Sequence, residues 1–476
     1  MTAEAQEHAQ ASVSVVDAFT DPNLLGRSFG EDTREAWRAV LSGAFALPMS
    51  ADRAALFKHL SGGRTAPQSR VRELWGVAGR RSDKTHTAAG VGVYMAAIGA
   101  ELDGTLSRLT AGERGVVMIL AVDRPQARVA LSYVRGLLED SPMLAPLVER
   151  QTAEGVTLKN GVSIEVATNS HRAVRGRTIL CAILDECAFY RDESSASPDV
   201  EVYRALMPSL ATTGGMLIGI SSPYAKRGLL YDKWRKHYGK DGDVLVVQGS
   251  TQQFNPNIDT RIIEDAEAED PEAARSEWHA QFRDDIAGFI DRETVEGAMR
   301  SSPLESPYDR QNRYAAFADP AGGGADEFTL SIGHVENKTT VIDCLRAQRG
   351  TPADIVAEYA DILTAYGIRK VWLDRYAGSW PSDEFARHGI EAEQAKDART
   401  GLYIDTLAAL NSDRVELPPD NRMLQQFVGL ERRKARSGRE TVDHPPGGHD
   451  DRANAVAGLI AHLSAGKPKP KLSEWI

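Results

Sequence analysis

The sequence predicts an α/β protein with two domains in a chain of 476 residues. In the first half, short apolar strands alternate with segments of helical periodicity, which is typical of a parallel sheet covered by helices. A charged helical stretch interrupts this alternation, and a second group of strands and helices follows it. The length agrees with this division, since it favours two or three domains at roughly 150 residues each.

The first half opens with a polar, aperiodic segment, residues 1 to about 30, which we expect to be a mobile tail. Helical spacing then runs from Ala36 to Leu60 and is interrupted by Pro48. The segment VTLKNGVSIEV predicts an inserted β-hairpin that turns at Asn160-Gly161. The strands expected in this half are Leu74–Ala78, Val116–Val122, Ile179–Leu184, Met216–Ile220 and Val244–Val247.

The second half begins after a helical segment rich in Glu and Asp, residues 251–305, which we interpret as a lid or linker. Four strands are expected after it, at Tyr314–Ala318, Phe328–Val335, Thr340–Leu345 and Lys370–Leu373, with helices at Ala353–Tyr366 and Arg452–His462. The predicted boundaries are therefore 1–60 for the tail and helical segment, 61–250 for the first core, 251–305 for the linker, 306–465 for the second core and 466–476 for a flexible Pro/Lys-rich tail.

Charge and cysteine content limit the class of protein. The 56 Lys and Arg against 67 Asp and Glu give a net charge of −11, which argues against histone-like binding but allows a local basic groove. Three cysteines without a CxxC pair make neither a disulfide framework nor a cysteine zinc site, so a reducing compartment is expected. The longest apolar stretch, Ala88 to Ala100, is shorter than the roughly 20 residues that span a bilayer, and no signal peptide is evident. We therefore expect an intracellular protein without a membrane segment.

The segment GVAGRRSDKTHTAA places a strand, a loop and a helix N-terminus in the order of a phosphate-binding loop. Lys84 is of the right type to reach the β/γ-phosphates, and Thr85 to hold Mg²⁺, at a helix end whose dipole favours anions. The match is degenerate, because Asp83 and Ala78 stand where the usual pattern has glycine. The loop alone does not decide between a nucleotide site and a basic surface turn.

A second motif favours the nucleotide site. The apolar run TILCAILDECAFY ends in Asp185 and Glu186, and adjacent carboxylates at the end of a parallel strand suit Mg²⁺ coordination and activation of the attacking water. Such acids also cap strand ends, but both motifs in this order make that interpretation improbable. The further residues expected around the nucleotide are Arg80, Arg81, Ser82, Asp83 and the strand tip Ser221-Ser222, where a guanidinium or a hydroxyl could reach the γ-phosphate. The serines alone would more commonly form a plain turn.

Acidic residues mark the second half. Asp319 and Asp374 end strands, Asp326 enters a strand, and Asp450-Asp451 begin a helix. Carboxylates on the first strand, the fourth strand and a late helix are the arrangement of an RNase H-like fold, in which they hold two Mg²⁺ or Mn²⁺ ions. Hard oxygen ligands suit these ions and fit zinc poorly. Each acid alone could be a turn or capping residue, but together they favour a metal site.

A basic run lies between these acids and comprises Arg432, Arg433, Lys434, Arg436 and Arg439. A solvated helix face is the usual meaning of such a run, and phosphate tracking is the alternative. Core or surface roles are expected for His86, His171, His449 and Trp380.

Taken together, these motifs resemble the large terminase subunit of tailed bacteriophages, an ATP-driven DNA-packaging motor with its own nuclease. The resemblance runs from about Glu73 to His462 and rests on VAGRRSDKTHTAA, AVDRPQA, RAVRGRTILCAILDECAFY, GISSPYAKRG, ADPAGGGADEFTL, VWLDRYAG and GGHDDRANA. It implies a P-loop ATPase domain of the RecA-like, ASCE type followed by an RNase H-like nuclease domain.

The resemblance also implies roles for single residues. Lys84 and Thr85 would bind ATP and Mg²⁺, Asp185 would be the Mg²⁺ ligand, and Glu186 the base for hydrolysis. The other implied roles are a loop arginine at Arg80, a coupling motif at Ser221-Ser222, and nuclease metal ligands at Asp319, Asp374 and one or both of Asp450 and Asp451.

By the same resemblance, the expected partners are double-stranded DNA, the portal protein, the small terminase subunit and further copies of the chain in a ring, expected as a pentamer, on the procapsid in the host cytoplasm. Two rival hypotheses stay open. A helicase–nuclease fusion of DNA repair should carry a second helicase domain, and none is visible after Val247. A DNA-tethering scaffold with a decayed ATPase is conceivable because of Asp83.

Overall fold

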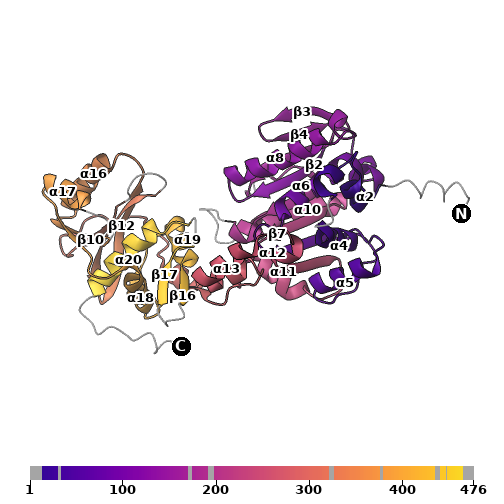
Figure 1. The fold of residues 1–476 in the computed structure, drawn as a ribbon. Coiled ribbons are helices and arrows are strands. Elements are labelled where there is room, and N and C mark those ends of the chain that lie inside the picture. The colour runs from indigo at the N-terminus through magenta and orange to yellow at the C-terminus, as the bar shows by residue number, and fades with distance from the viewer. Residues whose placement is uncertain are drawn as a thin grey trace, which may run out of the picture. The chain divides into compact units, whose positions relative to one another are not determined.

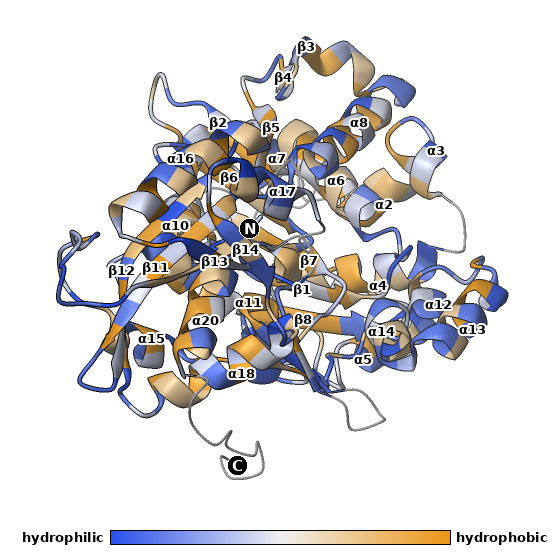
Figure 2. Cartoon of the chain, turned by 90° about the vertical axis from the view of Figure 1, so that its left-hand side faces the viewer, coloured by the Kyte–Doolittle hydropathy of each residue, from blue (hydrophilic) through white to orange (hydrophobic). Residues whose placement is uncertain are grey.

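The computed structural model describes residues 13–30, 34–169, 174–190, 198–320, 326–375, 379–434, 440–445 and 448–464. The chain divides into two compact units, with the boundary between Asp284 and Asp285. Each unit is built around its own sheet (Figure 1). In both, hydrophobic residues concentrate in the strands and on the helix faces packed against them (Figure 2).

The first unit contains an eight-stranded sheet in the order β3-β4-β5-β2-β6-β7-β1-β8. From β5 to β8 all neighbours are parallel, whereas β3, β4 and β5 pair antiparallel. Its strands are β1 (Glu73–Ala78), β2 (Gly115–Ala121), β3 (Val148–Thr152), β4 (Gly155–Leu158), β5 (Ser163–Thr168), β6 (Thr178–Asp185), β7 (Met216–Ser221) and β8 (Val244–Gly249). The strands expected in this half are confirmed, each within two residues at either end.

Successive strand residues point to opposite faces of this sheet, and the residues on both faces are apolar. Helices therefore cover both faces. Ile119 and Ile183 pack against one helical layer, and Met118 and Leu184 against the other. The helices are α2 (Val15–Thr20), α3 (Gly26–Phe29), α4 (Glu35–Ala44), α5 (Ala51–Leu60), α6 (Lys84–Tyr94), α7 (Ala100–Leu102), α8 (Arg124–Asp140), α10 (Pro198–Thr213), α11 (Leu229–His237), α12 (Thr251–Phe254), α13 (Thr260–Glu269) and α14 (Pro271–Glu277).

Two expectations for this unit need correction. Residues 13–30 are not a mobile tail, because α2 and α3 bury Val15, Phe19 and Phe29 in the core, while residues 1–12 lie outside the described part. The predicted hairpin exists, since Val156 pairs with Ile164 and Gly161 takes a left-handed φ of +84°. It is not a separate insertion, however, because β5 also pairs with β2 and extends the main sheet.

The second unit contains a six-stranded sheet in the order β14-β13-β10-β11-β12-β15 and a smaller sheet, β17-β16-β9. The three strands β10, β11 and β12 form an antiparallel meander, β13 pairs with β10 in parallel, and β14 pairs with β13 in parallel. Three successive strands followed by a helix and β13 confirm the predicted order of elements and the α/β fold class, whereas the parallel strand β14 was not predicted. The strands are β9 (Ile286–Gly288), β10 (Ala315–Asp319), β11 (Phe328–Glu336), β12 (Thr339–Gln348), β13 (Lys370–Leu373), β14 (Glu391–Gln394), β15 (Val415–Glu416), β16 (Glu431–Lys434) and β17 (Glu440–Asp443).

The helices of this unit are α15 (Arg292–Ala298), α16 (Pro352–Ala365), α17 (Trp380–Arg387), α18 (Arg399–Leu410), α19 (Asn421–Gly429) and α20 (Asp451–Ser464). The last of them, α20, lies against β10 and β11. Gly458 permits this close approach, because a Cβ there would lie 2.4 Å from Cζ of Phe317 on β10. The contact brings the start of α20 beside the end of β10, where acidic residues were predicted.

The predicted linker, residues 251–305, is divided between the units. The helices α12, α13 and α14 belong to the first, whereas β9 pairs with β16 and α15 packs on α18 and α19 in the second. Phe289, Ile290 and Val295 are core residues of the second unit, so it begins near 285 rather than 306.

The basic run is not a helix face. Arg432, Arg433 and Lys434 lie on β16 between β9 and β17, and Arg436 and Arg439 lie outside the described residues, as do His171 and the tail 466–476. Among the described helices, none has both the length and the apolar character needed to cross a membrane.

Candidate nucleotide site and carboxylate centre

The loop between β1 and α6 is shaped by side chains from outside it. Arg81 and Asp83 adopt left-handed φ values of +62° and +65°, a region in which Asp is tolerated better than most residues. Three carbonyl groups of the loop accept hydrogen bonds that fix this shape: Arg80 from Thr251 Oγ1 at 2.7 Å, Arg81 from Asn255 Nδ2 at 3.0 Å, and Ser82 from Trp37 Nε1 at 2.7 Å. These contacts hold the loop where the usual pattern relies on glycine.

Lys84 and Thr85, the first residues of α6, meet the acids at the end of β6. The Lys84 ammonium lies 3.0 Å from Glu186 Oε1 and donates to Ser222 Oγ at 3.2 Å. The Thr85 hydroxyl donates to Asp185 Oδ1 at 3.0 Å. Burial, and then the charge of Glu186, raises the pKa of Asp185 to about 7. A divalent cation beside this carboxylate would favour its ionised form, so the pair fits a Mg²⁺ site.

The predicted strand tip holds Glu186 in place. Ser221 Oγ donates to Glu186 Oε2 at 2.9 Å, and the backbone N–H of Ser222 donates to the same oxygen at 3.2 Å. Glu186 itself has a left-handed φ of +52°. The carboxylate is therefore fixed between β6 and β7, and the structure brings the predicted loop, acids and serines to one edge of the sheet.

Asp83, the departure from the usual loop pattern, is neutralised from the N-terminal segment. Its carboxylate forms an ion pair with Arg34 and lies 3.2 Å from His86 Nδ1. The His86 ring stacks on Phe29 with ring centres 4.3 Å apart. Burial, and then the charge of Arg34, lowers the pKa of His86 to about 4, so His86 is neutral at pH 7. Arg34 is thus the cation that balances Asp83.

A cavity of about 420 Å³ opens at this loop. Arg80 lines it while also pairing with Glu277 at 2.9 Å. His86, on the first turn of α6, also lines the cavity, although a core or surface role is expected for it from sequence. Other lining residues come from segments far from the loop in sequence, where no local pattern indicates them: Arg34, Tyr133, Phe254, Asn255, Asn257 and Ile258. Basic and hydroxyl groups at the loop beside apolar and amide side chains suit a phosphorylated ligand with an organic ring.

In the second unit, Asp319 at the end of β10 and Asp374 after β13 lie side by side. One amide joins them: Asn454 Nδ2 donates to Asp319 Oδ2 at 2.8 Å and to Asp374 Oδ2 at 2.5 Å. The side-by-side position follows from the parallel pairing of β10 with β13. Burial, and then the charge of Asp374, raises the pKa of Asp319 well above its usual range. Asn454, on the first turn of α20, was not foreseen from sequence.

Asp450 joins the same group. Its Oδ2 accepts from Tyr403 Oη at 2.6 Å, and its Oδ1 lies 3.3 Å from Nη1 of Arg399, whose Nη2 lies 3.7 Å from Asp374 Oδ2. Asp319, Asp374 and Asp450 are 8%, 3% and 3% exposed. Asp374 and Asp450 thus share one guanidinium, and besides burial the charges of both raise the pKa of Asp319, because buried carboxylates near one another repel unless cations neutralise them. The donor set of hard oxygens therefore fits Mg²⁺ or Mn²⁺.

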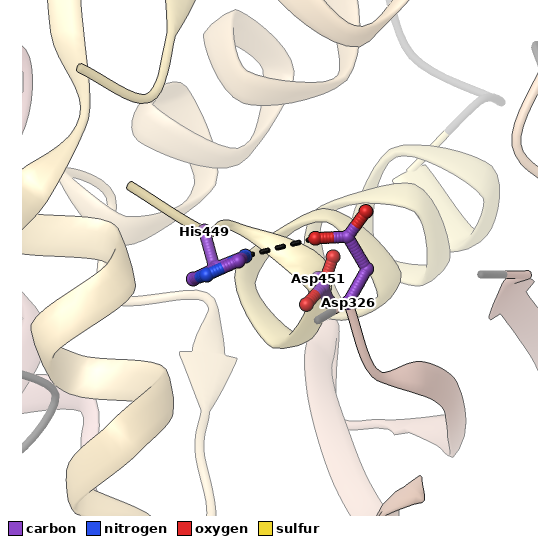
Figure 3. Close-up of side chains that lie close together, drawn as sticks. All are labelled: Asp326, His449 and Asp451. Carbon is purple, nitrogen blue, oxygen red and sulfur yellow. Dashed lines mark hydrogen bonds and ion pairs between the residues drawn. The ribbon is translucent and has the colours of Figure 1, made fainter. Parts of the chain in front are cut away.

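Of the two adjacent acids, one or both of which were expected to join Asp319 and Asp374, Asp451 faces a different group. Its Oδ2 accepts from the Glu327 N–H at 3.0 Å, and it gathers with Asp326 and His449 so that their ligand atoms lie within 4.8 Å of one another (Figure 3). His449 Nδ1 lies 2.9 Å from Asp326 Oδ1. From sequence, His449 was expected in a core or surface role. Its position in this group makes it a further candidate metal ligand instead.

Neither acid of the pair caps α20. Gln426 Oε1 accepts from the N–H groups of Arg452 and Ala453 at 2.8 and 3.1 Å. These are donors that a capping side chain would otherwise satisfy. The capping role, which was the alternative interpretation of Asp450-Asp451, is thus filled from α19, and both carboxylates remain available as ligands.

Several solved structures are similar to the chain. The HK97 bacteriophage large terminase is 14% identical with a TM-score of 0.38, over 90% of this chain and 99% of that chain. The large terminase of a thermophilic bacteriophage, solved in complex with ADP, is 11% identical with a TM-score of 0.38, over 91% and 99%. The large terminase nuclease from thermophilic phage G20c with bound magnesium is 21% identical with a TM-score of 0.30, over 33% and 84%.

No family model and no curated protein matches the chain. Identities and TM-scores this low assign no activity by themselves, so the function is argued from the two sites.

Proposed function

We propose that the chain is a viral genome-packaging subunit of the large terminase type. It hydrolyses ATP to move double-stranded DNA into a procapsid and cuts concatemeric DNA with a metal-dependent endonuclease. One observation carries the proposal: a triphosphate-type loop facing paired acids and a cluster of buried carboxylates occur in one chain, in that order. The resemblance of the sequence motifs to large terminases supports the same function.

At the first site, the proposal gives each residue a separate task. Lys84 binds the β/γ-phosphates, and Thr85 and Asp185 hold Mg²⁺, which neutralises phosphate charge when bound. Glu186 orients the attacking water and accepts its proton. Ser221 and Ser222, which hold Glu186, would link the state of the nucleotide to β7 and its neighbours, while Arg80 and Arg81 supply positive charge at the loop.

At the second site, Asp319, Asp374 and Asp450 are the proposed ligands of one divalent ion, and Asp326, His449 and Asp451 are candidates for another. Such ions activate water and stabilise the leaving oxygen of a phosphodiester. Asn454 positions two of the carboxylates, and Tyr403 positions Asp450. A DNA strand would bring the scissile phosphate to this edge of the sheet.

The partners follow from the proposed function. They are the portal protein, a small terminase subunit that recognises the packaging site, and further copies of the chain in a ring, proposed as a pentamer, in the host cytoplasm. Neither rival hypothesis has a specific observation in its favour. The ion pair between Arg34 and Asp83 also removes the main reason to suspect a decayed ATPase.

Separation of the two activities tests the proposal. Glu186→Gln should lower ATP turnover by orders of magnitude and leave Mn²⁺-dependent nicking of plasmid DNA in place, since positioning of water dominates phosphoryl transfer. Asp374→Ala should have the opposite effect. Glu264→Gln and Asp354→Ala, at exposed positions in the same units, are the matched controls. A Glu186→Gln protein that hydrolyses ATP at the wild-type rate would refute the ATPase assignment. Wild-type turnover that DNA fails to stimulate would favour the scaffold.

A further inference from the structure

A guanidinium contacts two of the buried carboxylates at the second site. Arg399, the first residue of α18, places Nη1 3.3 Å from Asp450 Oδ1 and 3.6 Å from Asp443 Oδ1, and Nη2 3.7 Å from Asp374 Oδ2. The guanidinium therefore faces two of the three buried carboxylates proposed as metal ligands. Its positive charge offsets part of the repulsion that these carboxylates exert on one another.

The contacts of Arg399 are loose. Charge-assisted N–H···O bonds are usually about 2.7–2.9 Å long, whereas those of Arg399 measure 3.3–3.7 Å. Its Nε is buried and has no hydrogen-bond partner within the described ranges. By contrast, Tyr403 holds Asp450 at 2.6 Å. Asp450 would thus remain in position if the guanidinium moved away. The guanidinium would lose only long, weak contacts by moving.

The side chain also has a route out. Arg399 is 28% exposed, while Asp374 and Asp450 are both 4% exposed at their side chains. Asp443, its third neighbour, is 46% exposed and lies towards solvent on β17. Rotation of the long side chain towards Asp443 would keep one ion pair and free the two buried carboxylates.

We propose that Arg399 is an internal counter-ion that competes with the divalent metal for Asp374 and Asp450. The proposal rests on the metal-dependent nuclease proposed above. A divalent ion would neutralise the same two carboxylates as the guanidinium. The metal ion and the guanidinium cannot both interact fully with Asp374 and Asp450 at the same time. Metal binding therefore displaces Arg399, and the metal concentration needed to load the centre is set in part by this displacement. The nuclease consequently has a higher metal threshold than its ligands alone would give.

The competition predicts an unusual direction of effect. Arg399→Ala in the full-length chain, stripped with EDTA, should bind Mn²⁺ about 10-fold more tightly by calorimetry, within the usual range of coupling between two sites. Half-maximal plasmid cleavage should need correspondingly less Mn²⁺. Arg399→Lys, which keeps the charge, should stay near the wild-type affinity. A residue that only supports the fold would lower the affinity when removed, so the sign of the change separates the two roles.

The controls make each outcome decisive. Arg387→Ala, which removes an exposed arginine from the same unit, should leave Mn²⁺ affinity unchanged. Arg399→Gln retains hydrogen-bonding capacity and serves if the alanine variant loses its fold by circular dichroism. Equal or weaker Mn²⁺ binding by a folded Arg399→Ala or Arg399→Gln protein overturns the counter-ion role and leaves the proposed nuclease standing. Failure of the wild-type chain to bind Mn²⁺ overturns the metal centre itself.

Discussion

Removal of Arg34 should weaken ATP binding through Asp83. In the structure, the Asp83 carboxylate immediately precedes Lys84 and is neutralised by Arg34. His86, its other neighbour, has a pKa of about 4 and carries no charge at pH 7. Arg34→Ala would therefore leave an uncompensated negative charge beside the loop that binds phosphates.

Coulomb's law gives the size of the effect. If the Asp83 carboxylate and a phosphate charge of bound ATP lie roughly 8 Å apart in an effective dielectric constant of about 20, they repel each other by about 2 kcal/mol. This repulsion corresponds to a change of about 30-fold in the Kd of ATP. The side chains of Arg34 and Asp83 are each 23% exposed, so solvent and salt screen part of this energy. We expect the dissociation constant of ATP to rise by about 5- to 30-fold, with a larger change at low ionic strength.

A double-mutant cycle tests the mechanism. Affinity for a fluorescent ATP analogue is measured for Arg34→Ala, Asp83→Asn and the double variant, and Asn is chosen because it tolerates the left-handed conformation of residue 83. The double variant should bind nearly as well as the wild type. Arg53→Ala, which breaks the ion pair with Glu35, is the control for general damage to the N-terminal helices. A double variant as weak as Arg34→Ala would refute charge balancing, because Arg34 would then contact the nucleotide directly.

Three further predictions concern pH, domain limits and metal binding. Because the pKa of His86 is lowered to about 4, the unfolded chain binds a proton between about pH 6.5 and 4 that the folded chain does not. Stability therefore falls as the pH falls through this window. Between pH 7 and 5, the Tm of His86→Gln should fall less than that of the wild type. A fragment of residues 285–464 should melt cooperatively. The fragment 306–464 lacks the buried side chains of Phe289, Ile290 and Val295, worth roughly 1.5–3 kcal/mol each, so it should melt at a much lower temperature or fail to fold. Equal Tm values of the two fragments would contradict the boundary at 285. Asp319→Asn removes a buried carboxylate, so it should raise Tm in EDTA and abolish the Tm increase that Mn²⁺ gives the wild type, and a full Mn²⁺ response would exclude Asp319 as a ligand.

The parts of the fold that the sequence predicted are those with a strong local signal. Strands β1 and β6 contain the continuous apolar runs Leu74–Ala78 and Ile179–Leu184, and such runs are buried wherever the chain places them. The order of the loop, the acidic strand end and the serine tip along the chain also followed from motifs. Their convergence needed only the rule that parallel strands present their carboxyl ends at one edge.

The missed elements depend on distant partners. Strands β14 and β16 have the sequences EAEQ and ERRK, which carry no β-propensity, and they form because β13, β9 and β17 offer backbone hydrogen bonds. Because the sequence ERRK has no apolar residue that would indicate a strand, the basic run looks in sequence like a solvated helix face. The cavity residues Arg34, which immediately precedes α4, and Tyr133, on α8, are remote from the loop in sequence, so no spacing rule could associate them with it.

The acidic pair at the start of α20 shows where sequence reasoning reaches its limit. Motifs put Asp450 and Asp451 on the right helix, but adjacent helical residues point about 100° apart, and the phase is set by packing. Gly458 presses α20 onto Phe317, and Gln426 caps its first turn. With the phase fixed in this way, Asn454, rather than Asp451, faces Asp319 and Asp374. Asp450, whose carbonyl accepts from the Asn454 N–H at 2.7 Å, precedes the first full turn and turns towards Arg399. Any substitution that rotates α20, Gly458→Ala above all, should therefore disturb both acidic groups although it touches neither.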